Sequence, residues 1–201
     1  MSTTISARDV KELRDKTGAG MMDCKHALTD AGGDLDEAVK ALRAKGLADA
    51  AKRAGRAANE GLIHSYIHQG GRVGGLVEVN CETDFVARTD VFKTFVHDVA
   101  LHVAAMRPLF VSAGVIPDDY VEAERSIFVE QARDVPEHAR DRAVEGKLRK
   151  HLATVTLLDQ QFVRDQNEKL PRTIEQLRGE VAAELGENVE IRRFAVFELG
   201  A

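Results

Sequence analysis

Cysteine, tryptophan and long apolar runs are scarce or missing in this 201-residue chain, which has two cysteines, no tryptophan and 5% aromatic residues. Cys24 and Cys81 lie far apart and neither belongs to a CxxC pair, so the sequence contains no zinc knuckle or redox motif of that kind. The low aromatic content argues against a platform on which single-stranded nucleic acid would stack its bases. No apolar stretch approaches the length that a bilayer crossing needs, so we expect no membrane partner.

The N-terminus lacks the basic-then-apolar layout of a secretion signal, and we therefore expect a cytoplasmic protein. The formal net charge is −5, which does not favour nonspecific attraction to nucleic acid. A basic stretch between Lys40 and Arg56 runs against this balance, and we interpret it as a solvated helix face and linker. The charge pattern thus predicts no direct nucleic-acid partner.

Catalytic and nucleotide-binding motifs are also missing. The sequence contains neither GxxxxGK[ST] nor GxGxxG, so we expect no bound nucleotide or other cofactor. His97 and His102 are five positions apart on a predicted helix, and His64 and His68 share a strand face without a third ligand nearby, so we expect no metal site. A nucleophilic Cys81 assisted by a histidine and Asp84 remains an alternative, although no family signature surrounds it. The prediction is a protein that is not an enzyme.

The first part of the chain, up to about residue 58, has the pattern of short helices. Ser6 with Asp9, and Asp34 with Glu37, have the spacing of capping boxes ahead of apolar residues at helical intervals. Three helices in such a short segment make a compact bundle that is more typical of a binding module than of a catalyst. We assign residues 1–55 to this N-terminal module.

Composition changes at Glu60, and residues 56–201 are predicted to form a second domain. Alternating residues at 62–69, a turn at Gly70-Gly71 and an apolar run at 73–80 indicate a β-hairpin. A third strand is expected at 189–197, with helices in between. The fold class is therefore α+β: a helical bundle followed by a small antiparallel three-stranded sheet packed with helices.

The link after the second predicted strand places a carboxylate and a large aromatic side by side, Asp84-Phe85, where small polar residues are usual. The Phe85 ring either folds back into the core or projects toward another protein. Periodicity does not choose between these alternatives.

Two long stretches carry a family resemblance. KELRDKTGAGMMDCK at residues 11–25 and EVNCETDFV at residues 78–86 resemble the two signatures of bacterial elongation factor Ts. Family-like stretches follow, namely HVAA at 102–105, VEGK at 144–147 and GENV at 186–189. The resemblance therefore extends over nearly the whole chain.

The resemblance implies a guanine-nucleotide exchange factor that binds elongation factor Tu·GDP, displaces Mg²⁺ and promotes GDP release during translation elongation. It implies that the N-terminal module is ubiquitin-associated-like and grips the nucleotide domain of that GTPase. The matching positions are Arg14, Met21 and Met22 for this grip, Thr83, Asp84, Phe85 and Val86 for Mg²⁺ dislocation, and His68 for a contact near the phosphate-binding loop. The methionines also suit a second task, filling the core of the bundle.

Long members of the family carry a duplicated core and an extra helical hairpin, whereas residues 91–95 here run quickly into sequence resembling the second half. One core unit remains, and the resemblance implies a homodimer, because short members of the family act as homodimers. We expect a noncovalent homodimer, because the sheet has edges to bury and its last strand contains no cysteine. A scaffold that binds proteins and dimerises without exchange activity is the alternative function.

Overall fold

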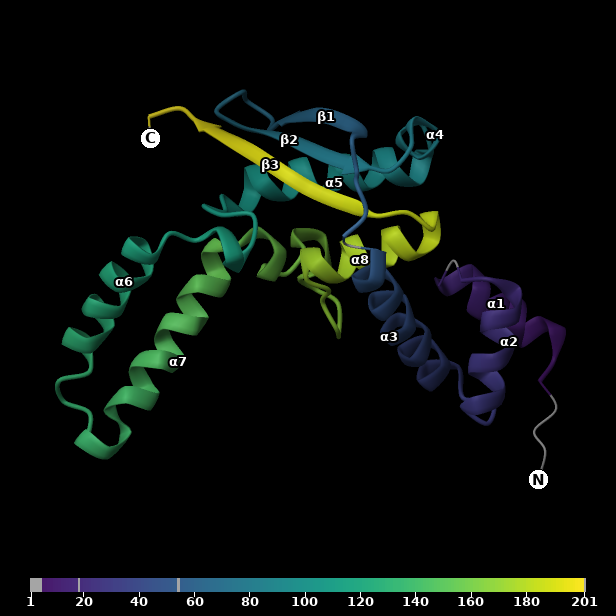
Figure 1. Cartoon of the computed structure of the whole chain (residues 1–201), viewed down its shortest axis with the longest axis horizontal. Coiled ribbons are helices and arrows are strands. Elements are labelled where there is room, and N and C mark those ends of the chain that lie inside the picture. Colours follow the sequence, from purple (N-terminus) through teal and green to yellow (C-terminus); the bar gives the residue numbers. More distant parts are fainter. Residues whose placement is uncertain (1–4, 18, 54, 201) are drawn as a thin grey trace. The chain divides into compact units, whose positions relative to one another are not determined.

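The computed structural model of the chain describes residues 5–17, 19–53 and 55–200, and it is α+β as predicted. Short 3-10 turns at Ala113–Val115, Leu157–Asp159 and Val163–Asp165 connect the later helices. Figure 1 labels the helices and strands, which in chain order are α1 (Ala7–Thr17), α2 (Met21–Asp30), α3 (Leu35–Arg53), β1 (Glu60–Ile67), β2 (Val73–Cys81), α4 (Asp84–Ala87), α5 (Asp90–Met106), α6 (Asp118–Gln131), α7 (Glu137–Val155), α8 (Ile174–Leu185) and β3 (Val189–Glu198).

The three N-terminal helices form the predicted bundle. Ser6 and Asp9 make a reciprocal capping box: each backbone N–H donates to the other side chain, both at 3.2 Å. This pairing satisfies two amide donors that the first helical turn leaves without a partner. The bundle closes around one small apolar core, whose fully buried members include Leu13, Cys24 and Leu28.

The sheet has the strand order β1-β2-β3 and is antiparallel, as predicted. The β1–β2 turn forms where the glycine pair predicted it: Gly70 and Gly71 have φ of 89° and 67°, values that favour glycine. The backbone N–H of His68 donates to the carbonyl oxygen of Val73 at 2.9 Å and closes the hairpin. Val77 and Val79 lie on the same face of β2 and are almost fully buried.

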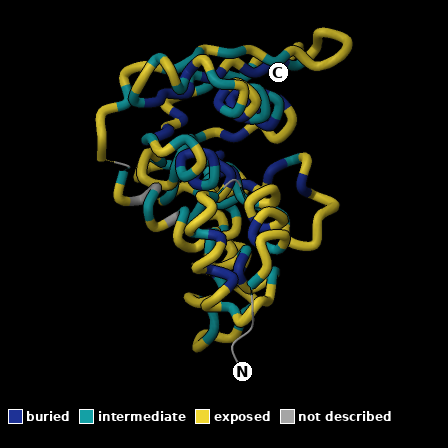
Figure 2. Tube along the Cα trace, turned by 90° about the vertical axis from the view of Figure 1, so that its right-hand side faces the viewer, coloured by how far each residue is buried: buried dark blue, intermediate teal, exposed yellow. Residues whose placement is uncertain are grey.

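Helix α5 packs against β2, and its residues Phe92, Val99 and Val103 are fully buried. Strand β2 approaches this helix closely at Gly75, where an added Cβ would lie 2.9 Å from the carbonyl oxygen of Ala100. A side chain at position 75 would therefore force the strand away from the helix. Figure 2 colours the trace by burial and shows buried stretches where elements pack together and exposed ones outside.

Helices α6 and α7 pack against each other as an antiparallel hairpin (Figure 1). Near its base, the Tyr120 hydroxyl lies 3.1 Å from Nε2 of His151, and a Glu124 carboxylate oxygen lies 3.4 Å from the same nitrogen. Phe128 packs edge-to-face on the imidazole. Farther along, Arg125 pairs with Glu145 of α7. These contacts hold α6, which contains no fully buried residue, against its partner helix.

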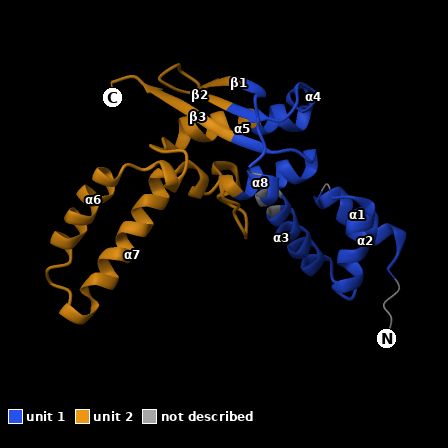
Figure 3. Cartoon of the chain, viewed as in Figure 1, with its two compact units in different colours: residues 1–62, 79–95, 176–190 blue, residues 63–78, 96–175, 191–201 orange. Residues whose placement is uncertain are grey.

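The chain divides into two compact units, coloured separately in Figure 3. The first contains residues 1–62, 79–95 and 176–190, and the second contains 63–78, 96–175 and 191–201. The proposed boundary between residues 55 and 56 stays a prediction. In the described parts of the chain, no helix has the length and apolar character required to cross a bilayer.

Candidate protein-binding site

The link between β2 and α5 contains one short helical turn, α4 (Asp84–Ala87), which begins within the 83–86 segment. Thr83 is the N-cap, and its side-chain oxygen accepts a hydrogen bond from the N–H of Val86 at 3.4 Å. A threonine cap with an acidic residue next to it is a favoured helix start, which explains why the strand ends in a helical turn. The expected turn between β2 and α5 is thus a capped helical turn.

Phe85 projects from this turn, and 77% of its surface is exposed. Of the two alternatives left open for this ring, the structure supports the projecting one. Asp84 accepts a hydrogen bond from the guanidinium of Arg88 at 2.7 Å, one helical turn later. Val86 is half-buried and Ala87 is buried. The 83–86 segment therefore presents an exposed aromatic ring and a carboxylate from a base that is anchored in the fold.

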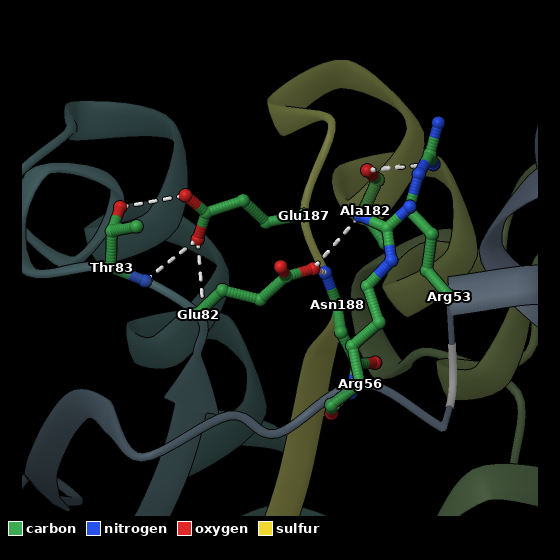
Figure 4. Close-up of polar contacts among 7 residues, drawn as sticks. All are labelled: Arg53, Arg56, Glu82, Thr83, Ala182, Glu187 and Asn188. Atoms are coloured by element: carbon green, nitrogen blue, oxygen red, sulfur yellow. Dashed lines mark hydrogen bonds and ion pairs between the residues drawn. The ribbon is translucent and has the colours of Figure 1, made fainter.

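Glu187 anchors that base, and sequence reasoning did not identify it. One of its carboxylate oxygens accepts the backbone N–H groups of Glu82 and Thr83, each at 3.0 Å. The other accepts the Thr83 hydroxyl at 2.6 Å (Figure 4). Glu187 follows α8 and precedes β3, so the contact joins residues 104 positions apart.

A second set of contacts fixes the segment that carries Glu187. The carboxylate of Glu82 accepts the backbone N–H of Asn188 at 2.6 Å, and a nitrogen of the Arg56 guanidinium lies 3.5 Å from the same oxygen. The Asn188 side chain donates to the carbonyl oxygen of Arg56 at 2.8 Å (Figure 4). Glu187 thus holds the backbone of Glu82 and Thr83, and Glu82 holds the backbone of Asn188, the residue after Glu187. The GENV stretch carried the resemblance, but no periodicity in it signals these roles.

Cys81 lies at the end of β2, directly before this region, and is fully buried. Burial raises the pKa of its thiol to about 11, and the nearby Glu187 carboxylate acts in the same direction. The thiol therefore stays protonated at neutral pH and donates a hydrogen bond to the carbonyl oxygen of Thr83. A thiol in this state is a poor nucleophile, which argues against the alternative of a cysteine-dependent enzyme.

The three predicted contact residues of the N-terminal module are all exposed. Met21 and Met22 begin α2, with 53% and 60% of their surfaces exposed. Arg14 is exposed on α1, which packs against α2. Because both methionines remain accessible, they do not fill the bundle core, whose members are other residues. Exposed methionines on a well-packed support are suited to adaptable apolar contacts.

His68 is exposed just after β1, and its Nδ1 lies 3.2 Å from the Tyr66 hydroxyl. It belongs to the second compact unit, whereas the 83–86 segment and the bundle residues belong to the first. His64, on the same strand, lies with Nε2 3.2 Å from Nδ1 of His97 on α5. Burial, and then His97, lowers the pKa of His64. Within the described residues, no group of three or more potential ligands lies close enough to hold a metal ion.

The basic stretch that runs along α3 and beyond it is largely paired with carboxylates. Each pair joins nitrogen and oxygen within 3.5 Å, and the pairs are Lys40–Glu37, Arg43–Glu180, Lys45–Asp23, Lys52–Asp49 and Arg56–Glu82. The paired carboxylates lower the net positive charge of this face. The expectation of no direct nucleic-acid partner stays a prediction.

The fold and the site together define an α+β protein with a helical bundle and an exposed aromatic turn. Residues 5–176 match the family model described as elongation factor TS. The chain belongs to the elongation factor Ts family, as the sequence signatures indicated.

Named relatives extend the similarity over almost the whole chain. An elongation factor Ts from Thermoanaerobacter sp. (strain X514) is 52% identical over 198 residues, which cover 98% of this chain and 95% of the relative. One from Syntrophobacter fumaroxidans is 50% identical, with complete coverage of both chains. One from Geobacter sulfurreducens is 49% identical, covering 98% of this chain and 90% of its own length.

Proposed function

We propose that this chain is a guanine-nucleotide exchange factor for elongation factor Tu and acts in the cytoplasm during translation elongation. In this proposal it binds elongation factor Tu·GDP, displaces Mg²⁺ and promotes release of GDP. The observation that carries the proposal is the exposed Phe85 at the tip of an anchored turn, in a member of the elongation factor Ts family. When a partner covers an exposed aromatic ring, apolar surface leaves water and the free energy of the complex is lowered.

The mechanism requires no bond-making by this chain. Bound GDP and the bound factor each weaken the other's affinity for the GTPase, and this coupling is reciprocal. To accelerate release by about four decades, the chain must stabilise the open state by about 5.5 kcal/mol relative to the closed state. Burial of one phenylalanine supplies roughly 1.5–3 kcal/mol. Phe85 is therefore a major contributor, and other contacts must supply the rest.

The exposed residues of the N-terminal module supply part of that remainder in the proposal. Met21 and Met22 offer apolar area, and Arg14 offers a planar cation with several donors. These contacts would hold the factor on the GTPase while the 83–86 segment inserts near the Mg²⁺ site. The carboxylate of Asp84 would enter beside the metal, where an added negative charge changes the electrostatic balance among ion, phosphates and protein. His68 would make a further contact near the phosphate-binding loop.

We also propose a noncovalent homodimer. An exposed apolar face of the sheet supports this pairing more directly than the edges of its strands do. Ile67, Leu76, Phe197 and Leu199 are exposed around a hollow of about 510 Å³ on the outer side of the sheet. An aliphatic and aromatic surface of this kind is typical of a protein contact. The buried Cys24 and Cys81 are unsuited to an intermolecular disulfide, so the pairing would depend on apolar burial.

Stopped-flow measurement of GDP dissociation tests the proposed function. Elongation factor Tu loaded with a fluorescent GDP is mixed with excess unlabelled GDP, with and without increasing amounts of this chain. The proposal expects a rate that rises with concentration to a plateau far above the spontaneous rate. Binding without any acceleration would instead support the scaffold alternative. Chelation of Mg²⁺ in a parallel series would reduce the acceleration, because the step that the factor assists would already be complete.

A further inference from the structure

The position of the exposed Phe85 ring depends on the backbone that carries it. With 77% of its surface in solvent, the ring itself makes little packing that could fix its direction. The four-residue helix α4 is also too short to be stable alone. Burial of Ala87 and the Arg88–Asp84 hydrogen bond hold the end of the turn, and its beginning is held by contacts of the residues directly before it.

Those contacts converge on one carboxylate. Glu187 accepts hydrogen bonds from two successive backbone N–H groups, of Glu82 and Thr83, and from the Thr83 hydroxyl. Hydrogen bonds to an ionised acceptor are stronger than those between neutral groups. The carboxylate thereby fixes both the backbone and the rotamer of Thr83, whose hydroxyl oxygen also caps α4 by accepting the N–H of Val86.

We infer that Glu187 is a positioning residue that holds the 83–86 segment in the conformation that inserts into the partner. The inference deepens the proposed exchange function and rests on it. Glu187 makes no contact with nucleotide or Mg²⁺ in this assignment, and it acts through Thr83. Its effect is to remove in advance the ordering cost that a flexible segment would pay on binding.

The backbone that carries Glu187 is itself held by hydrogen bonds, so its carboxylate has a fixed position from which to hold Thr83. The next residue, Asn188, donates its backbone N–H to the Glu82 carboxylate and its side-chain N–H to the Arg56 carbonyl oxygen. The thiol of Cys81, at the end of β2, donates a hydrogen bond to the carbonyl oxygen of Thr83. Thr83 is therefore held through its N–H, its carbonyl oxygen and its hydroxyl at the same time.

Amide hydrogen exchange in the free protein tests the structural half of the inference. Glu187→Ala removes all three acceptor contacts, and the matched control is Glu184→Ala, an exposed glutamate on α8. We expect the amides of Glu82 and Thr83 to exchange at least about tenfold faster in Glu187→Ala only, because they lose a charged acceptor. The amides of Val77 and Val79 report on the core and should keep their protection. Unchanged exchange at Glu82 and Thr83 would overturn the inference.

The kinetic half uses GDP release from elongation factor Tu at saturating factor. We expect Glu187→Ala to lower the maximal release rate about tenfold, because the loosened segment must pay a cost of ordering when it inserts. The concentration for half-maximal rate should change little, because the N-terminal contacts are intact. Glu187→Gln should lie between wild type and Glu187→Ala, since its amide oxygen can still accept from the two N–H groups. Adding Thr83→Ala to Glu187→Ala should lower the rate less than Thr83→Ala does in wild type.

Amide exchange and GDP-release kinetics together distinguish a positioning role of Glu187 from a general structural role and from failure of the proposed exchange function. Loosened amides in Glu187→Ala with a wild-type maximal rate would show that ordering this turn does not matter for exchange, and would refute the positioning role. A fall of stability and of all amide protection would show a general structural role instead. Should the wild-type chain leave GDP release unchanged, the proposed function and the part of Glu187 in it both fail. Amide exchange alone then decides whether Glu187 orders the turn.

Discussion

The Sγ atom of Cys81 lies 3.2 Å from the carbonyl oxygen of Thr83 and donates a hydrogen bond to it. Because burial raises the pKa of this thiol to about 11, the proton needed for the bond is present throughout the neutral range. A side chain at the end of β2 thus helps to hold the residue that caps α4.

Cys81 should resist alkylation in the folded protein. Raising the thiol pKa from 9.0 to about 11 lowers the fraction of reactive thiolate at neutral pH roughly a hundredfold. Iodoacetamide treatment at several pH values, followed by mass spectrometry of the Cys81 peptide, measures the rate. It should be very low at pH 7 and should increase with pH toward about 11. Rapid labelling of the folded chain at neutral pH would contradict the buried, protonated thiol.

Phe85→Ala should leave the fold intact and slow GDP release from elongation factor Tu. The ring is exposed, so its loss removes little packing within the chain, whereas its burial in a partner is worth roughly 1.5–3 kcal/mol. The maximal stopped-flow rate should therefore fall by about one to two decades. Leu170→Ala, at another exposed apolar residue, is the control and should exchange normally. Equal rates for both variants would remove Phe85 from the mechanism.

Replacing Met21 and Met22 together by alanine should weaken the complex more than it weakens the fold. Both side chains are exposed, and alanine is compatible with the first turn of α2. Loss of their apolar area should raise the Kd for elongation factor Tu by about tenfold or more, measured by titration calorimetry. Met106→Ala, at an exposed methionine of α5, should bind as wild type. If the double variant bound normally, the grip would have to lie elsewhere on the module.

The proposed homodimer can be disrupted by a charge on the sheet face. Phe197→Lys places an ammonium at the hollow beside Ile67 and Leu76, where a partner copy would have to desolvate it. Light scattering across a concentration range should then give the mass of one chain for Phe197→Lys and of two for wild type. Ile127→Lys, on the exposed side of α6, should remain dimeric. A wild-type chain that is monomeric at all concentrations would disprove the pairing.

Stability should fall with acidification in a window set by His102. This buried imidazole accepts the N–H of Val163 through Nδ1 at 3.2 Å, so it is neutral and donates through Nε2 to Gln160 at 2.9 Å. Burial lowers its pKa from 6.5 to about 4. Between these values the unfolded chain binds the proton that the folded chain does not, so stability rises with pH in that window and is constant above it.

The size of the effect follows from the same shift. About 3 kcal/mol of unfolding free energy should be lost progressively as the pH falls from 6.5 toward 4. Urea denaturation at pH 5.0–7.0 measures the upper part of this slope. His102→Gln, which cannot titrate, should have a flatter profile even if it is less stable at pH 7. Parallel profiles for the two proteins would contradict a neutral buried His102.

Features that depend on neighbouring residues were predictable from the sequence. The Ser6 capping box and the Gly70-Gly71 turn each follow from residues within a few positions of one another, because short-range hydrogen bonds and steric preferences decide them. The antiparallel hairpin and the final strand followed from period-two alternation. The resemblance then supplied the candidate residues of the 83–86 segment and of the bundle.

Features that depend on distant residues were not predictable. The bonds from Glu187 to Thr83 connect parts of the chain that only the folded sheet brings together. Alternation in β1 did not tell which residues face α5, and the structure leaves Ile63 and Ile67 exposed while His64 and Tyr66 are half-buried. In the same way, the need for Gly75 comes from a helix that is remote in sequence.

The link between Thr83 and Glu187 also sets an order of events during synthesis of the chain. The ribosome makes Thr83 more than a hundred residues before it makes Glu187, since the two are 104 positions apart. A nascent chain that has already exposed both the bundle and Phe85 still lacks the acid that holds the turn. Termination between residues 88 and 186 would therefore yield a product that contains the bundle and Phe85 but lacks the carboxylate that holds Thr83.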